Sequence, residues 1–355
     1  MPTQPRHRRF AVLLAAFALA AGCTAAALGA PFWQHASALK PLENAKLWVN
    51  TAPIAPAALQ GKVVLLDFWT YSCINCLRTL PYVKAWARKY APHGLVVIGV
   101  HTPEFGFERM PENVARAAGQ LAIDFPVALD SERVVWTSSG VQAWPTMDFI
   151  DAKGMRRHRQ VGEGRYEESE RMIQQLLEEA GKANVPRDLV TPQGTGTQAA
   201  PGSMSATSAE TYLGAARAQG FTAAGGTLRA GATQAFTAAP RLGPGGWTLA
   251  GRWQVEPEHI EATQAGGRIA YRFRARDVHL VLGPSQDGRP VRFRVTIDGQ
   301  APGNDRGTDV AGDGTGSVDS HRIYQLVRQA DPRRERLFEI QFLDPGVRAY
   351  AFTFG

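Results

Sequence analysis

Cysteine is scarce in this sequence. Its 355 residues include three cysteines, too few for the disulfide framework of a small secreted scaffold. Cys73 and Cys76 lie two residues apart, and the third is Cys23. Zinc would need more cysteine or histidine ligands at suitable spacing, and the histidines are scattered. A structural bridge closing so small a loop would constrain the unfolded chain little. The pair therefore favours redox chemistry, with no metal.

An apolar run long enough for a membrane span and a basic run interleaved with aromatic residues are also missing. The longest apolar run near the start, residues 10–21, is too short for a comfortable membrane span. The formal net charge is +7, but no basic run with interleaved aromatic residues appears. Nucleic acid is therefore not an expected partner.

The N-terminus has the pattern of a targeting signal. A basic head that includes Arg6, Arg8 and Arg9 precedes the apolar run, so residues 1–30 are predicted to be a signal peptide or a lipoprotein signal or anchor. Residues 20–23 resemble a lipobox, in which Cys23 would be lipidated. Cleavage within residues 25–30 and retention as an uncleaved anchor are the alternatives. All three predict a periplasmic or other extracytoplasmic location, in two cases with membrane attachment.

The length predicts two domains, because 355 residues exceed one typical domain. The first is expected over residues 31–181. Residues 182–208 are rich in Gly, Ser, Thr, Pro and Ala without apolar periodicity, which predicts a flexible linker. Residues 209–355 form the second domain.

The first domain has the alternating pattern of an α/β fold. Residues 63–69 are almost wholly apolar and predict a buried strand, residues 77–90 have helical spacing, and residues 95–100 predict a second parallel strand. The other elements expected are helices over 111–121, 131–139 and 166–180, and strands over 123–129, 141–150 and 155–162. Ser131 is the expected cap of the second of these helices.

The cysteine pair falls where the first strand gives way to the first helix. Ser72 can cap a helix that starts at Cys73. The unpaired N–H groups and the dipole of a helix N-terminus favour a thiolate over a thiol. Cys76 lies one turn further on and is the natural resolving partner.

The motif Asp-Phe-Trp-x-x-x-Cys-x-x-Cys, with Pro81 five residues after the second cysteine, resembles thioredoxin. The resemblance implies that Cys73 is the nucleophile, Cys76 the resolving thiol and Asp67 the buried acid that assists proton transfer. No cofactor is implied beyond a redox-active Cys73–Cys76 disulfide.

The wider sequence, over residues 69–76 and 99–105, resembles the extracytoplasmic thioredoxin part of DipZ-type proteins, close to the TlpA-like thioredoxins. This implies a thiol–disulfide oxidoreductase that reduces disulfides of envelope proteins and is recharged by a membrane electron donor of the CcdA or DsbD type. Ile74 and Asn75 stand where cytoplasmic thioredoxin has Gly-Pro, which leaves the redox potential open.

Six residues are predicted to contact substrate. The resemblance makes Pro145 a cis-proline facing the disulfide, with Trp144 as a groove wall, Thr146 beside it and Tyr71 on the cysteine side. His101 and Glu104 follow the second parallel strand at its carboxyl end, where α/β sheets place their sites, so both could approach Cys73, with loop capping and packing as the alternative.

The sequence of the second domain predicts an all-β fold. Alternating patterns over 271–282, 291–297, 336–342 and 347–354 predict two sheets packed as a sandwich. Residues 209–214 and 322–327 resemble the C-terminal module of DipZ-type proteins. The fold class predicted is thus an α/β thioredoxin-like fold, with a central mixed sheet flanked by helices, followed by an all-β galactose-binding-like sandwich.

The same resemblance implies a carbohydrate-binding-like module, with a glycan as its ligand. Trp247, Trp253 and Tyr324 are then candidates to stack on a sugar ring, with core packing as the alternative. Four acids in a Gly-rich loop, at residues 305, 309, 313 and 319, lack the spacing of an EF-hand and are expected to be solvated turn residues.

Two other functions stay open. A thiol peroxidase would place a threonine three residues before its reactive cysteine, as Thr70 is, but it would also have proline where this chain has Leu66. A glycan- or partner-binding envelope protein with a vestigial redox site would explain the second domain, but not the coincidence of Asp67, the cysteine pair, Pro81 and Pro145.

Overall fold

The computed structural model describes residues 37–202 and 208–355. These residues belong to one compact unit, which begins at Ala36 and ends at Gly355. The predictions for residues 1–30, including Cys23, lie outside the described residues. Among the helices that the structure describes, none has the length and apolarity needed to span a membrane.

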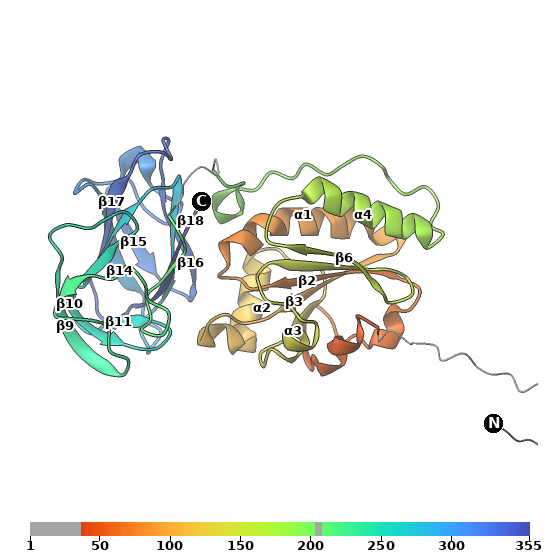
Figure 1. Ribbon diagram of the computed structural model, residues 1–355, viewed down its shortest axis with the longest axis horizontal. Helices are drawn as coiled ribbons and strands as arrows, with labels where there is room; N and C mark the ends of the chain where they lie inside the picture. The colour runs from red at the N-terminus through yellow and green to blue at the C-terminus, as the bar shows by residue number, and fades with distance from the viewer. Residues whose placement is uncertain (1–36, 203–207) are drawn as a thin grey trace, which may run out of the picture. The chain divides into compact units, whose positions relative to one another are not determined.

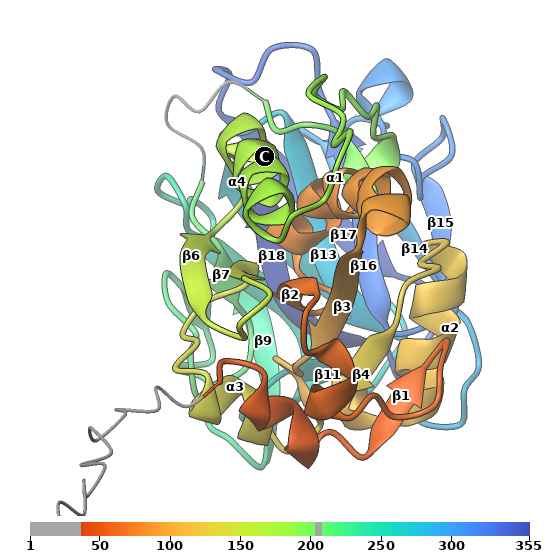
Figure 2. The same ribbon diagram turned by 90° about the vertical axis from the view of Figure 1, so that its right-hand side faces the viewer.

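The first domain is built on one six-stranded mixed sheet with the order β1-β4-β3-β2-β5-β6 (Figure 2). Strands β2, β3 and β4 are parallel, and the other three are antiparallel to their neighbours. The strands are β1 (Leu47–Val49), β2 (Val63–Trp69), β3 (Leu95–His101), β4 (Val127–Leu129), β5 (Thr146–Ile150) and β6 (Arg156–Val161). The mixed sheet confirms the predicted thioredoxin-like class of this domain.

Helices cover both faces of this sheet. They are α1 (Ile74–Tyr90), α2 (Pro111–Gln120), α3 (Val134–Ser138) and α4 (Tyr166–Glu179). Short 3-10 helices add η1 (Lys40–Asn44), η2 (Pro56–Leu59), η3 (Ala91–His93) and η4 (Gly106–Arg109). In Figures 1 and 2, α1 and α4 lie side by side on one face of the sheet. Residues of η1 and α3 pack on the opposite face.

Strand β2 is buried on both faces, as its apolar sequence predicts. Because side chains alternate along a strand, Leu65 and Trp69 join the core under α1, whereas Leu66 and Phe68 join the opposite core. Asp67 has the same parity as Leu65 and Trp69. The strand therefore directs this carboxylate toward the helix that carries the cysteines.

The predicted helices are present, but two predicted caps are wrong. Helix α1 begins at Ile74, and its N-cap is Cys73 rather than Ser72. The backbone N–H groups at the start of α3 donate to Asp130, whereas the Ser131 hydroxyl donates to the Arg109 carbonyl. In both places a neighbouring side chain reaches the open N–H groups and leaves the serine free for another acceptor.

The segment predicted as a flexible linker is attached at several points. Val185 is buried, and the Val190 N–H donates to the Glu170 carboxylate at 2.8 Å. Its short helix η5 (Gly196–Gln198) includes the carbonyl of Gly196, which accepts from Arg328 of the second domain at 3.2 Å. These contacts fix the described linker residues to both domains, a feature that composition alone does not indicate.

The second domain is all-β, as predicted, and its named strands pair antiparallel throughout. They follow one continuous path, β15-β14-β17-β12-β10-β11-β18-β13-β16, with β7, β8 and β9 attached beside it. The first six strands are β7 (Thr211–Tyr212), β8 (Ala223–Ala224), β9 (Ala232–Ala238), β10 (Trp247–Val255), β11 (Ile260–Ala262) and β12 (Arg268–Phe273). The others are β13 (Asp277–Gly283), β14 (Val291–Ile297), β15 (Thr315–Val318), β16 (Arg322–Arg328), β17 (Arg336–Phe342) and β18 (Arg348–Phe354), with η6 (Gly303–Asp305) between β14 and β15.

Strand β10 joins the two layers of this domain. Its first half pairs with β12, and its second half, from Gly251, pairs with β9 and β11. Gly251 has φ +97°, and a Cβ there would lie 3.2 Å from the backbone of Gly267. Only glycine takes that conformation without strain, so this residue lets one strand leave one sheet and enter the next.

The single alternating run predicted over residues 271–282 is wrong in detail. It is divided between β12 and β13, which belong to different layers. Every residue of β13 is buried. Val278, Leu280 and Leu282 enter the core of the second domain, whereas Val281 joins the core of the first, together with Ile323 and Ala351. The outer face of this layer is therefore covered by the first domain.

The predicted sugar-stacking aromatics are core residues. Trp247, Trp253 and Tyr324 each have 0% exposure, so no sugar ring can lie against them. The four loop acids are held by neighbours: Asp305 and Asp309 form ion pairs with Arg336 and Arg322, Asp313 accepts from Thr315, and Asp319 accepts from Ser320.

Candidate active site

Cys73 stands between β2 and α1 and is partly exposed. It has extended backbone, with φ −91° and ψ 115°, and its sulfur accepts the Cys76 N–H at 3.2 Å. A sulfur that caps a helix in this way receives one of the open N–H groups of the first turn. Both cysteines are free thiols in this structure.

Cys76 lies one turn into the helix and is buried, with 4% exposure. Burial raises the pKa of the Cys76 thiol well above its ordinary value. The hydrogen bond with the Cys73 side chain and the nearby Asp67 carboxylate raise it further. A thiol of this kind stays protonated until a base removes its proton.

Asp67 is the base that the sequence predicts. It is 3% exposed, and burial raises its pKa to about 7. Of the partners that the described residues provide, none forms a hydrogen bond with its Oδ1 atom. A carboxylate with an unpaired oxygen and a pKa near neutrality can accept and return a proton under ordinary conditions.

The predicted groove residues are Trp144 and Pro145, which directly precede β5, and Thr146, the first residue of that strand. The Trp144–Pro145 peptide bond is cis, as the resemblance implies. The Thr146 hydroxyl donates to the Ala143 carbonyl at 2.7 Å. Trp144 packs on Trp136, with ring centroids 4.4 Å apart, and this contact fits a packing role as well as a groove wall.

Tyr71 and His101 form a buried stack next to the cysteines. Their ring centroids are 5.5 Å apart, and their exposures are 3% and 1%. Burial lowers the pKa of His101 to about 3, so its ring is neutral, and burial raises the pKa of Tyr71. The His101 Nε2 atom lies 3.3 Å from the Thr70 hydroxyl. His101 therefore supports the loop before Cys73 from behind.

The structure places Glu104 against the second domain. Its Oε1 atom accepts from the Tyr212 hydroxyl at 2.6 Å and from Arg217 at 3.0 Å. The prediction that this carboxylate approaches Cys73 failed to anticipate these partners, because sequence position at a sheet edge does not reveal a second domain packed there.

Sequence reasoning missed Glu108. This side chain has 0% exposure, and its carboxylate accepts from the hydroxyls of Thr70 and Ser72 and from the N–H groups of Ser72, Glu104 and Phe105. Thr70, which a peroxidase would need beside Cys73, thus donates its hydroxyl hydrogen bond to Glu108. A charged residue directly after the aromatic pair Phe105 and Phe107 was the one signal available.

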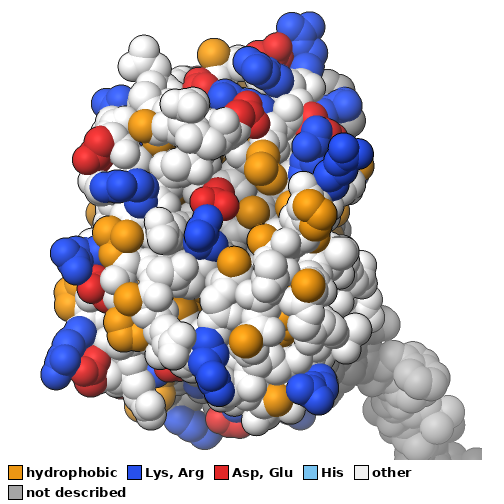
Figure 3. Space-filling view, turned by 90° about the vertical axis from the view of Figure 1, so that its left-hand side faces the viewer, with side chains coloured by type: hydrophobic (Ala, Val, Ile, Leu, Met, Phe, Trp, Pro, Cys, Tyr) orange, Lys and Arg blue, Asp and Glu red, His pale blue; other side chains and the backbone are white. Residues whose placement is uncertain are grey.

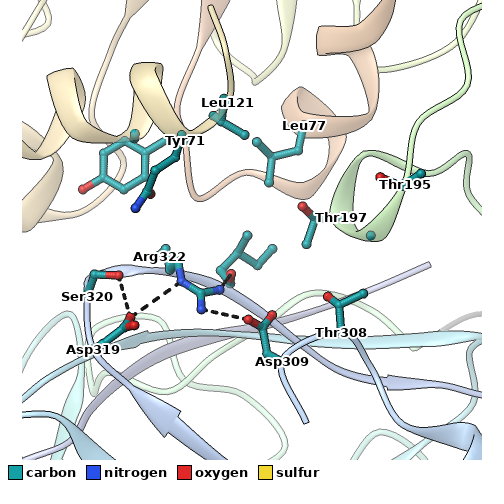
Figure 4. Close-up of a pocket in the computed structure, with 14 residues that line it drawn as sticks. Tyr71, Leu77, Leu121, Thr195, Thr197, Thr308, Asp309, Asp319, Ser320 and Arg322 are labelled. Atoms are coloured by element: carbon teal, nitrogen blue, oxygen red, sulfur yellow. Dashed lines mark hydrogen bonds and ion pairs between the residues drawn. The ribbon is translucent and has the colours of Figure 1, made fainter. Parts of the chain in front are cut away.

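A cavity of about 560 Å³ lies between the two domains (Figure 4). Tyr71 and Leu77, which flank the cysteine motif in sequence, line one side with Leu121. Arg322 lies opposite, where it forms an ion pair with Asp309 at 2.8 Å. Within the residues described here, no three His, Cys, Asp or Glu side chains are grouped to hold a metal ion.

Two separate parts of the chain match known families. Residues 45–176 match the family described as Redoxin, and residues 208–355 match the family described as Thioredoxin like C-terminal domain.

Among known relatives, Protein DipZ of Mycobacterium bovis is 37% identical over 261 residues, which are 70% of this chain and 36% of that protein. The chain thus spans about a third of the length of this relative. Thiol-disulfide oxidoreductase YkuV of Bacillus subtilis is 26% identical over 39% of this chain and 93% of the relative. A solved thiol-disulfide isomerase from Corynebacterium glutamicum is 24% identical, with a TM-score of 0.35, over 38% of this chain and 97% of that chain.

Proposed function

We propose that this chain is a thioredoxin-like thiol–disulfide oxidoreductase, which its similarity to Redoxin over residues 45–176 and to Protein DipZ supports, and that it exchanges disulfides through the pair Cys73 and Cys76. The observation that carries the proposal is the arrangement of three groups. A partly exposed sulfur caps α1, a buried thiol follows one turn later, and an acid whose pKa is about 7 lies beneath.

The reaction proceeds in two exchanges. The Cys73 thiolate attacks one sulfur of a client disulfide, the client S–S bond breaks, and one client sulfur leaves as a thiolate that takes up a proton. Cys76 then passes its proton to the Asp67 carboxylate and attacks the Cys73 sulfur. The mixed disulfide breaks, the second client thiolate leaves, and the client has gained two electrons while Cys73 and Cys76 form a disulfide.

The pKa of Asp67 supports its part in the second exchange. At pH 8 most Asp67 carboxylates with a pKa of about 7 are ionised and can accept the Cys76 proton, whereas at pH 6 most are protonated and cannot. A base so placed shortens the lifetime of the mixed disulfide.

The direction and the setting are further parts of the proposal. A reductant of disulfides in envelope proteins, recharged by a membrane electron donor of the CcdA or DsbD type, fits the similarity to DipZ. An extracytoplasmic location, with or without lipidation of Cys23, fits the N-terminal sequence. Trp144, Pro145 and Thr146 are proposed to line the path of the client chain.

A glycan-docking role of the second domain is a separate proposal with weaker support. The aromatics predicted for it are buried. On the face shown in Figure 3, basic and acidic side chains are interspersed and hydrophobic ones lie in small separate patches. This face therefore shows no large continuous hydrophobic area on which a sugar ring could stack.

Cys73→Ser tests the proposed activity. We expect the variant to lose insulin-disulfide reduction with dithiothreitol, because serine cannot form the mixed disulfide. Cys76→Ser is the matched variant: it should trap the client as a mixed disulfide on Cys73, visible on a non-reducing gel. Full activity of Cys73→Ser would exclude the mechanism.

A further inference from the structure

The carboxylate of Glu108 connects two loops that meet beside the cysteines. Its Oε2 atom accepts the N–H groups of Glu104 and Phe105 at 2.7 and 3.0 Å, within its own loop. Its Oε1 atom accepts the Ser72 hydroxyl at 2.6 Å, the Ser72 N–H at 3.3 Å and the Thr70 hydroxyl. Capping the short helix η4 would need one oxygen. The other oxygen serves the residues that lead into Cys73.

The second domain holds the opposite side of the same loop. The Gly106 N–H donates to Glu258 at 2.9 Å, and Glu104 accepts from Tyr212. The Phe105 and Phe107 rings pack on Tyr350, with centroids 5.2 and 4.8 Å away. Each of the four residues that precede Glu108 therefore contacts the second domain, while Glu108 itself turns inward.

The loop before Cys73 has few other supports of equal strength. The Thr70 hydroxyl donates to Glu108 and accepts from His101 Nε2, which lies 3.3 Å away. Tyr71 is held by stacking on His101 and by a tilted contact with Phe107 at 6.0 Å. The described hydrogen bonds of the Ser72 side chain and N–H group all end on Glu108.

We propose that Glu108 is a positioning residue for Cys73. The second domain packs on residues 104–107 and, through the Glu108 carboxylate, holds residues 70–73 in their reactive arrangement. The second domain is then part of the oxidoreductase itself. The inference rests on the proposed thiol–disulfide function and assigns that function a control by domain docking. Groups held in a packed hydrogen-bond network transmit such a constraint without touching the reacting atoms.

Glu108→Gln tests the inference in the full-length protein. Glutamine supplies one acceptor oxygen and places N–H groups against donors, so one of the two loops loses its acceptor. We expect the rate of Cys73 alkylation by iodoacetamide and the equilibrium constant with glutathione each to change about tenfold. Tyr212→Phe combined with Glu258→Ala, which removes two hydrogen bonds between this loop and the second domain, should change both about threefold in the same direction.

Glu170→Gln is the matched control. Glu170 is equally buried, at 1% exposure, and accepts from Trp86, Lys89 and Tyr90. Those residues lie near the far end of α1, about 20 Å along the helix from Cys73 at 1.5 Å per residue. This variant should lose stability while both thiol measurements stay at the wild-type values.

Two results would overturn the inference. Unchanged alkylation and glutathione equilibrium in Glu108→Gln would remove the positioning role. A change in Glu108→Gln with none in the Tyr212 and Glu258 double variant would remove the second domain from it. Should Glu108→Gln fail to fold, Ser72→Ala, which removes one donor, takes its place. Alkylation of Cys73 needs no client protein, so it tests the inference even if the proposed function is wrong. A wild-type protein unable to reduce disulfides would contradict the proposed function alone.

Discussion

Two buried carboxylates flank the cysteine pair, and they differ in how they are satisfied. Asp67, on β2, has an oxygen with no partner among the residues described, and its pKa is about 7. Glu108, on the loop after β3, accepts five donors. An unsatisfied acid can change its charge at small cost, whereas one surrounded by donors is fixed in place. The comparison separates a group that moves protons from a group that holds structure.

The largest effect on stability is expected for Glu108→Leu, which tests this comparison. Removing the carboxylate leaves five donors without their acceptor in a buried place, and each donor left unpaired costs about 1–3 kcal/mol. We expect the free energy of unfolding of the reduced protein to fall by about 4 kcal/mol or more, because some donors will find water. Urea denaturation at pH 7 measures it. Glu258→Gln, at an exposed position that accepts one N–H, is the control and should change stability little.

Asp67→Asn should change stability in the opposite direction. Because the folded-state pKa of about 7 exceeds the ordinary 3.8, the folded protein binds more protons than the unfolded chain between these values. Its stability therefore falls as pH rises from 4 to 7, by up to about 4 kcal/mol at 1.36 kcal/mol per pKa unit. Asparagine does not titrate. The variant should be more stable than wild type at pH 8, and the gain should disappear by pH 4.

Urea denaturation of both reduced proteins at pH 4, 6 and 8 checks this prediction. A difference between wild type and Asp67→Asn that is independent of pH would show that the carboxylate is ionised throughout. The contrast with Glu108 would then be lost.

The two carboxylates also differ in how far sequence could predict them. Asp67 lies in a strand whose residues 63–69 were predicted with the observed bounds, and its role follows from the spacing to Cys73 that resembles thioredoxin. Glu108 receives its donors from its own loop and from residues 36 to 38 positions earlier. No periodicity connects such positions, so only the folded chain reveals them.

The same limit applies to the second domain. Its strands β14 and β17 were predicted with the observed bounds, because alternation is local. The covering of β13 on both faces was not, although its uninterrupted burial has a sequence signal in Val-His-Leu-Val-Leu. Trp247 and Trp253 were considered for sugar stacking because composition cannot distinguish an exposed aromatic from a core one.

The smallest effect is expected for Glu104→Gln, at the edge of the contact between the domains. Its ion pair with Arg217, which is 53% exposed, contributes at most about 1 kcal/mol. Glu104 and Glu210 also compete for one Tyr212 proton, at 2.6 and 2.8 Å. A glutamine amide can donate to Glu210 and remove that repulsion, which offsets the lost ion pair. We therefore expect a change in unfolding free energy below about 1 kcal/mol.

Urea denaturation of Glu104→Gln beside Glu108→Leu measures the difference between a carboxylate at the edge and one in the interior of the same loop. Arg217→Met is the control, since it removes the ion pair with Glu104 together with the guanidinium that lies over the Tyr212 ring, and leaves the Glu104 carboxylate in place. Glu104→Gln could instead lower the free energy of unfolding as much as Glu108→Leu. The loop would then depend on the second domain as strongly as on its own buried carboxylate. Burial would no longer explain which of the two acids stabilises the protein more.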